Sequence, residues 1–170
     1  SPDIPFAGFI YDKISIPRPG HADLVGVTKY NFNDIRNSIE RSSARETAVR
    51  VAAGTVARKF LEEFGITIGS FVEGIGGIRP KKNLYTELLE NNVTGKFSAW
   101  QISAMADKSS VRVLDNDQEE KIIRKIKSAK KKGDTLGGTF VTFATGVPVG
   151  LGSYMHYDRR LSAAISHSIM

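Results

Sequence analysis

The chain has 170 residues, of which 41% are hydrophobic and 25% charged, and its formal net charge is +6. This length is enough to bury a core, and no apolar run approaches the roughly 20 residues that cross a bilayer, so membrane contact is not expected. The absence of cysteine excludes disulfides and thiolate chemistry and makes the cytoplasm the default location.

In chain order, an irregular entry leads into a short predicted strand over residues 10–16. The Pro-Arg-Pro-Gly turn at 17–20 follows and interrupts regular structure, because proline fixes φ and restricts the residue before it. Asn33 and Asp34 are typical caps, and they predict a short helical turn through Ile39.

A long helix is predicted next. Ser43-Ala-Arg-Glu46 has the spacing of a capping box, and Gly65 fits the position that ends the helix. Between them, small and apolar residues recur every three or four positions and predict a buried stripe, formed by Ala48, Val49, Ala52, Ala53, Val56, Phe60 and Phe64.

The second half of the chain is expected to mix strands and helices, which makes the fold class α+β. Strands are predicted over 66–75, with Gly69 and Gly74 marking bulges or weak points, and over 137–145. An amphipathic helix is predicted from Asn116 to Gly133. Shorter segments complete the prediction: a helix over 84–90, a strand over 111–114, a loop over 146–152, and a last helix capped by Asp158 that carries Leu161, Ala164, Ile165 and Ile169.

The start of the Ser43 helix is a candidate anion site. A helix N-terminus offers unpaired N–H donors and the positive end of the helix dipole. Arg41 lies just outside this helix, and Arg45 lies in its first turn, where an acidic side chain would suit the dipole better. An ordinary capped helix with solvated arginines explains the same pattern equally well.

Arg18 and His21 place a guanidinium and an imidazole on one constrained loop. Imidazole titrates near neutral pH, so a positioned histidine serves as a general acid or base, and Asp23 is placed to orient it. A histidine in a turn is more often polar surface. His156 and His167 have weaker cases, and the spacing of the three histidines predicts no metal site.

A basic helix accounts for most of the net charge. Residues 117–132 carry seven basic side chains against three acidic ones. This pattern suits either a solvated amphipathic helix or a module that binds nucleic acid or another polyanion. The solvated helix is favoured, and nucleic acid is not expected as a partner, because no aromatic side chains lie nearby to stack on bases.

Four blocks of sequence closely resemble the chorismate synthase family. They are RPGHAD and ERSSARETAVRVAAG in the first third of the chain, and GDTLGG and ATGVPVGLGS after residue 132. The resemblance implies a lyase that eliminates phosphate (1,4-anti) from 5-enolpyruvylshikimate 3-phosphate to give chorismate. It further implies a β-α-β sandwich, with helices layered between antiparallel sheets, assembled as a homotetramer.

The resemblance also implies a cofactor and residue roles. The family needs reduced FMN, and the electrons come either from NADPH or from an outside reductant. His21 matches a family proton donor, and Arg18 and Arg45 match positions that hold the anionic substrate. Arg41, Ser42 and Ser43 match the stretch that contacts the flavin, and no residue matches a metal ligand.

The family is roughly twice as long as this chain. We therefore expect residues 1–170 to be a single domain, a fragment of a longer chain with an incomplete sandwich. Alone, the fragment is expected to have little or no activity, and an inert folded remnant is an alternative to a binding-competent one.

Overall fold

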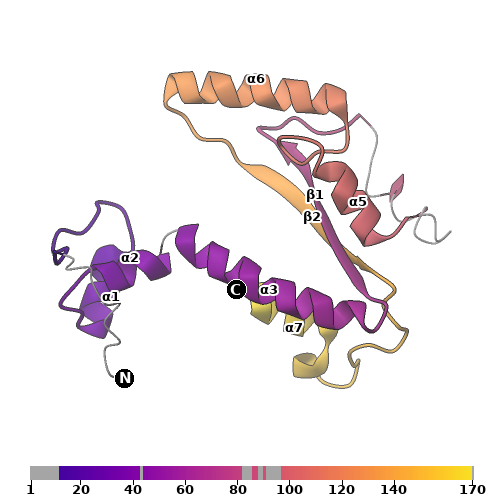
Figure 1. The fold of residues 1–170 in the computed structure, drawn as a ribbon, viewed down its shortest axis with the longest axis horizontal. Helices are drawn as coiled ribbons and strands as arrows, with labels where there is room; N and C mark the ends of the chain where they lie inside the picture. The colour runs from indigo at the N-terminus through magenta and orange to yellow at the C-terminus, as the bar shows by residue number, and fades with distance from the viewer. Residues whose placement is uncertain (1–11, 43, 82–85, 88–89, 91–96, 170) are drawn as a thin grey trace. The chain divides into compact units, whose positions relative to one another are not determined.

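The computed structural model describes residues 12–42, 44–81, 86–87, 90 and 97–169. The chain divides into two compact units, residues 1–57 and 58–170, which are described separately below. Within the described residues, helices accompany one antiparallel pair of strands (Figure 1), and the predicted α+β class is confirmed. The elements are α1 (Asp23–Tyr30), α2 (Arg36–Ser42), α3 (Ala44–Glu62), β1 (Thr67–Ile75), α5 (Ala99–Ala106), α6 (Asn116–Lys132), β2 (Gly138–Thr145), η1 (Tyr157–Arg159) and α7 (Leu161–Ile169).

The predicted strand over residues 10–16 is wrong for residues 12–16, which have no regular structure, while residues 10 and 11 lie outside the described part. The backbone of this segment makes its hydrogen bond with a helix and not with a strand. The carbonyl of Ile14 accepts a hydrogen bond from the N–H of Ile35 at 3.0 Å, so this segment pairs with the start of α2 instead of a strand.

The predicted cap of the short helix is confirmed at Asp34, whose Oδ1 accepts the N–H of Arg36 at 2.9 Å. The helix extends to Ser42, beyond the predicted end at Ile39. Before it lies α1, which was not predicted and which ends at Asn31 in the left-handed conformation, with φ of 53°.

The long helix α3 begins at Ala44 as predicted and ends at Glu62, before Phe64 of the predicted stripe, and it extends across the boundary between the two units. Gly65 has φ of +75° and donates its N–H to the carbonyl of Glu62, which confirms its role at the end of the helix. Ser43, the predicted cap, lies outside the described residues. No residue of α3 is buried within the described chain, so the predicted apolar stripe is exposed, with Phe60 64% accessible.

Strands β1 and β2 form an antiparallel pair that runs from Thr67 opposite Thr145 to Ile75 opposite Gly138. Both predicted strands are therefore confirmed. The register shifts between Val72 and Gly74, which confirms Gly74 as a bulge position. Gly69 has another role, because a Cβ there would lie 2.2 Å from the carbonyl oxygen of Ala99 on α5.

Helix α5 packs against β1 (Figure 1) and forms the core of the second unit. Its N-terminus has a capping box, in which Ser98 Oγ accepts the N–H of Gln101 and Gln101 Oε1 accepts the N–H of Ser98. The core consists of Phe71, Ile102 and Ala106, against which Leu114, Val141 and Phe143 pack.

The predicted basic helix is confirmed as α6, with Asp115 as its N-cap, and Gly133 ends it with φ of 66°. Among the apolar residues of this helix, Ile122 and Ala129 are buried, while Ile126 is 38% exposed. Gln118 is also buried, and its Nε2 donates to the carbonyl of Glu73 at 2.7 Å, which ties α6 to β1.

The predicted strand over 111–114 is wrong, because Arg112 adopts φ of 58° in the left-handed region and breaks the extended run. Its carbonyl nevertheless accepts the N–H of Val72 at 2.8 Å, and its guanidinium donates to the carbonyl of Ser70. The predicted cap at Asp158 is also wrong, since that residue lies inside η1.

The last helix itself is confirmed as α7, and the loop over 146–152 has no helix or strand. Of the predicted helix over 84–90, residues 86–87 and 90 are helical and the rest lie outside the described part.

Candidate active site

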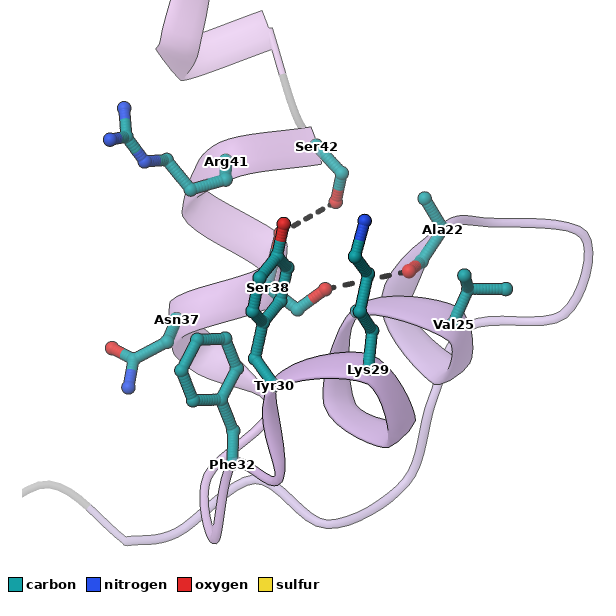
Figure 2. Close-up of a pocket in the computed structure, with 10 residues that line it drawn as sticks. Ala22, Val25, Lys29, Tyr30, Phe32, Asn37, Ser38, Arg41 and Ser42 are labelled. Atoms are coloured by element: carbon teal, nitrogen blue, oxygen red, sulfur yellow. Dashed lines mark hydrogen bonds between the residues drawn. The ribbon is translucent and has the colours of Figure 1, made fainter.

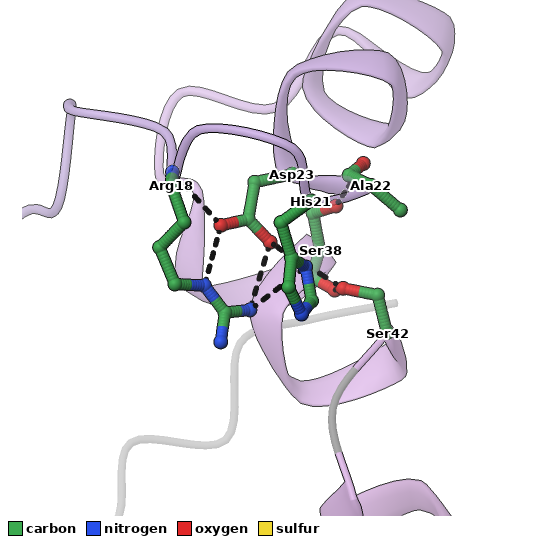
Figure 3. Close-up of polar contacts among 6 residues, drawn as sticks. All are labelled: Arg18, His21, Ala22, Asp23, Ser38 and Ser42. Carbon is green, nitrogen blue, oxygen red and sulfur yellow. Dashed lines mark hydrogen bonds and ion pairs between the residues drawn. The ribbon is translucent and has the colours of Figure 1, made fainter. Parts of the chain in front are cut away.

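The candidate site is built around the carboxylate of Asp23, the first residue of α1, which has no exposed surface. Arg18 binds it with both arms of its guanidinium (Figure 3). The Nε of Arg18 lies 2.7 Å from Asp23 Oδ2, and its Nη2 lies 2.9 Å from Oδ1. The backbone N–H of Arg18 donates to Oδ2 as well, at 3.2 Å. This bidentate pair holds the 18–21 loop on the start of α1.

His21 is attached to the same carboxylate through one ring nitrogen. Its Nδ1 lies 3.0 Å from Asp23 Oδ1 and 3.1 Å from Arg18 Nη2. The loop turns at Gly20, whose φ of +69° lies in the region that favours glycine. The His21 side chain is 32% exposed, and its Nε2 has no hydrogen-bond partner among the described residues. The imidazole is thus held on one side and open on the other.

Helix α2 contributes a serine to this network. Ser42 Oγ lies 2.6 Å from the carbonyl of Ser38 and 3.4 Å from Asp23 Oδ1. The two helices approach closely because Gly26 lacks a side chain, since a Cβ there would lie 2.0 Å from Ser38 Oγ. Ser38 in turn donates to the carbonyl of Ala22 at 3.4 Å.

Two crossed ion pairs span the junction between α2 and α3. Arg41 Nη1 lies 2.9 Å from Glu46 Oε2, and Arg45 Nη1 lies 2.6 Å from Glu40 Oε1. The hydrogen bond from Arg41 holds the pKa of Glu46 below its usual value. Both arginine side chains remain about three-quarters exposed, at 77% and 75%. Both arginines of the predicted anion site therefore pair with carboxylates of this chain. Ser43, between the two helices, lies outside the described residues.

A cavity of about 290 Å³ lies between α1 and α2. Tyr30 and Phe32 stack with ring centroids 5.6 Å apart, and Lys29 Nζ lies 5.4 Å from the centre of the Tyr30 ring. Figure 2 shows these side chains and the residues around them. The lining consists of Ala22, Val25, Gly26, Lys29, Tyr30, Phe32, Asn37, Ser38, Arg41 and Ser42.

The structure thus brings together three of the predicted site residues, Arg18, His21 and Ser42, on Asp23. Arg41 and Ser42 also line the cavity, whereas Arg45 is among neither its lining residues nor the Asp23 network. Sequence reasoning missed Lys29, Tyr30 and Phe32 because it did not predict α1. The signal available for them was two aromatic residues and a lysine beside Asn31, a residue type that tolerates the left-handed helix end.

Other candidate features lie in the second unit. The lysines of α6 are exposed, as a solvated helix face requires. In the part of the chain that the structure describes, no three histidine, cysteine or acidic side chains come together as a metal site. None of the described helices combines the length and the apolar character needed to cross a membrane.

Comparison with known proteins identifies the family. A sequence model of chorismate synthase matches residues 9–170, nearly the whole chain. The chain belongs to the chorismate synthase family. This membership accounts for all four sequence blocks that resembled the family.

Individual relatives agree with the family match. Chorismate synthase from Chlorobium limicola is 54% identical over 160 residues, which cover 93% of this chain and 39% of that protein. The enzyme from Listeria welshimeri is 48% identical over 158 residues, with 93% and 38% covered. A crystal structure of chorismate synthase matches with a TM-score of 0.72 and 43% identity, covering 88% of this chain and 44% of that one. The expected fold family is confirmed, and the chain spans about two fifths of the length of its curated relatives.

Acid should destabilise the first unit of this chain through Asp23. The side-chain hydrogen bonds from Arg18 hold the pKa of Asp23 well below its usual value. A carboxyl whose pKa is lower in the folded state than its unfolded value of about 4 stabilises the fold above that pH and loses the effect as pH falls. We therefore expect Asp23→Asn to be less stable than the wild type at neutral pH, and to lose less stability on acidification to about pH 3.

Urea unfolding followed by the backbone amide NMR signals of α1 and α2 measures this at each pH. Asp34→Asn is the comparison variant. The N–H of Arg36 lowers the pKa of Asp34 at the cap of α2, so this change should remove a separate part of the acid sensitivity and leave the part that comes from the Asp23 network. Equal acid sensitivity in the wild type and Asp23→Asn would contradict the assignment.

Proposed function

We propose that this chain supplies one part of the active site of a lyase that eliminates phosphate, by a 1,4-anti route, from 5-enolpyruvylshikimate 3-phosphate to give chorismate with reduced FMN. Family membership supports the reaction. The observation that carries the assignment of residues is the Asp23 carboxylate, which holds the guanidinium of Arg18 and the imidazole of His21 within 3.0 Å. A cation and a proton-transfer group side by side suit a phosphorylated, carboxylated substrate.

Arg18 and Arg45 are the proposed substrate-binding residues. Arg18 uses Nε and Nη2 on Asp23, and its Nη1 has no hydrogen-bond partner among the described residues. That nitrogen remains to donate to a phosphate or carboxylate oxygen. The pair between Arg45 and Glu40 is exposed, and pairs of this kind contribute only about 0.2–1 kcal/mol, so an anionic substrate exchanges with Glu40 at little cost.

Arg41, Ser42 and Ser43 are the proposed flavin contacts. The chemistry of the described residues fits this group, because Arg41 offers a cation and Ser42 a hydroxyl at the rim of a cavity that also presents the stacked rings of Tyr30 and Phe32. When bound, reduced FMN supplies an electron-rich ring system to the reaction. The proposal does not include NADPH, because no feature of the described residues points to a nicotinamide site.

The family resemblance extends the proposal to a homotetramer in the cytoplasm that needs no nucleic acid. Exposed apolar side chains support assembly, among them Phe60 on α3 and Ile169 on α7, which are 64% and 77% accessible. Burying such a side chain against another subunit is more favourable than leaving it exposed to water.

Anaerobic titration of the chain with reduced FMN, with and without substrate, tests the cofactor assignment through flavin absorbance. We expect reduced FMN to bind, and Arg41→Ala to raise its Kd by about 10- to 150-fold, since hydrogen bonds to charged groups contribute about 1.5–3 kcal/mol. The control is the triple change of Lys127, Lys130 and Lys131 to glutamine on α6, which should leave the response unchanged. No flavin response in the wild-type chain would support the inert remnant. Loss of a salt-dependent nucleic-acid affinity in the lysine variant would support the polyanion-binding alternative.

A further inference from the structure

We propose that Asp23 is a positioning residue for His21: its carboxylate holds the imidazole through Nδ1, so that Nε2 is the nitrogen that exchanges a proton with the reactants. This inference rests on the proposed function for its catalytic meaning. Its structural part concerns only the loop at 18–21 and helices α1 and α2, which lie in one unit.

The contacts of Asp23 exclude it as a reacting group. Oδ1 is approached by Arg18 Nη2 at 2.9 Å, His21 Nδ1 at 3.0 Å and Ser42 Oγ at 3.4 Å. Oδ2 accepts the Nε and the backbone N–H of Arg18 at 2.7 and 3.2 Å. A carboxylate has about four lone-pair directions, and the four nitrogen contacts alone fill them. With no exposed surface, Asp23 acts on the reaction only through its neighbours.

Arg18 and Asp23 favour opposite tautomers of His21. If the proton is on Nδ1, the ring donates to Asp23 Oδ1 at 3.0 Å. If the proton is on Nε2, Nδ1 instead accepts from Arg18 Nη2 at 3.1 Å and faces the carboxylate with a lone pair. The negative charge of Asp23 disfavours that second arrangement, because Oδ1 would face the Nδ1 lone pair at 3.0 Å. Asp23 thus sets the tautomer as well as the ring orientation, which leaves the lone pair of Nε2 directed away from the network.

The same oxygen links His21 to the proposed flavin stretch. Asp23 Oδ1 contacts both His21 Nδ1 and Ser42 Oγ, and Ser42 lies next to Arg41 at the rim of the cavity. Figure 3 shows the histidine and the serine approaching Asp23 from the loop and from α2. Asp23 therefore connects the histidine loop with helix α2 on this side of the site.

Nitrogen-15 NMR of the His21 ring in this chain, at a pH where the ring is neutral, tests the positioning directly. We expect the wild type to carry its proton mainly on Nδ1, and Asp23→Asn to move the population toward Nε2. Arg18→Gln removes the opposing donor and should leave the proton on Nδ1, which keeps the test decisive if Asp23→Asn fails to fold. Asp34→Asn, which removes a negative charge in the same unit, should leave the tautomer population of His21 unchanged. A wild-type ring protonated on Nε2, or a tautomer population unaffected by Asp23→Asn, would overturn the inference.

Measurements of kcat and KM distinguish a failure of this inference from a failure of the proposed function. In a full-length relative whose matching region is replaced by this sequence, Asp23→Asn should lower kcat about 10- to 1000-fold, because proton transfer at His21 loses its positioning residue. KM should also rise, because Asp23 holds the guanidinium of Arg18 as well. A shifted tautomer with unchanged kcat would leave the positioning intact and contradict the proposed role of His21.

Discussion

Replacing His21 by asparagine should lower kcat by about 10²–10⁴-fold in a full-length relative that carries this sequence in place of its own matching region, the range expected for loss of a general acid or base. The asparagine amide can still donate to Asp23 Oδ1, which the wild-type imidazole approaches to 3.0 Å, so the buried network keeps a partner. What disappears is a ring nitrogen able to exchange a proton at neutral pH. KM should change little, since Arg18 and not His21 carries the positive charge for the substrate.

His156→Asn is the matched control for this measurement. His156 is exposed, precedes η1 in the second unit, and makes no side-chain hydrogen bond within the described residues. We expect its kcat to stay within about twofold of the unmutated enzyme, in line with surface substitutions away from a site. Comparable turnover in His21→Asn and His156→Asn would remove His21 from the proposed chemistry and leave only its structural place on Asp23.

The histidine loop was the most predictable part of the candidate site. Pro17 and Pro19 restrict the backbone, and Asp23 follows His21 at a distance that permits a side-chain contact. The sequence therefore predicted both the loop and the orienting carboxylate. It did not predict that Arg18 would use two nitrogens on that carboxylate, because bidentate geometry depends on where α1 begins.

Helix α1 was not predicted because its residues have low helix propensity. Its sequence, DLVGVTKY, contains a glycine and three β-branched residues, all poor helix formers, and no side chain caps its N-terminus. What stabilises it is tertiary: the Asp23 network at its first residue, and the contact of Gly26 with Ser38 on α2. Local helix propensity cannot report contacts with side chains outside the helix, such as Arg18 before it and Ser38 after it.

In the second unit, the sequence contained a signal for the start of α5 but none for the backbone conformation of Arg112. The Ser98-x-x-Gln101 capping box was present in the sequence and would have predicted the start of α5. At Arg112, by contrast, the residue type gives no sign of a positive φ. The conformation persists because its guanidinium donates to the carbonyl of Ser70 and to Ser103 Oγ, partners that only the folded chain provides.

The largest expected loss of stability comes from the core of the second unit. Phe71→Ala should lower its free energy of unfolding by about 3–5 kcal/mol, the usual cost of truncating a buried phenylalanine. Phe71 is 1% exposed on β1, and its ring meets that of Phe143 edge to face at 6.3 Å between centroids. Ile102 and Ala106 of α5 pack on the same ring, so the truncation leaves a cavity between sheet and helix.

Phe140→Ala on β2 is the control, because it truncates the same residue type at an exposed position. Phe140 pairs with Val72, the neighbour of Phe71 on β1, yet it is 74% exposed. Its truncation should cost less than about 1 kcal/mol, because it removes a cross-strand contact without opening a core cavity. Amide hydrogen exchange of β1 and β2 measures both variants in the second unit alone, without relying on the unfolding of the first. Equal losses at Phe71 and Phe140 would mean that the strand pair is held by its ladder and not by α5, and that the apolar cluster does not stabilise this unit.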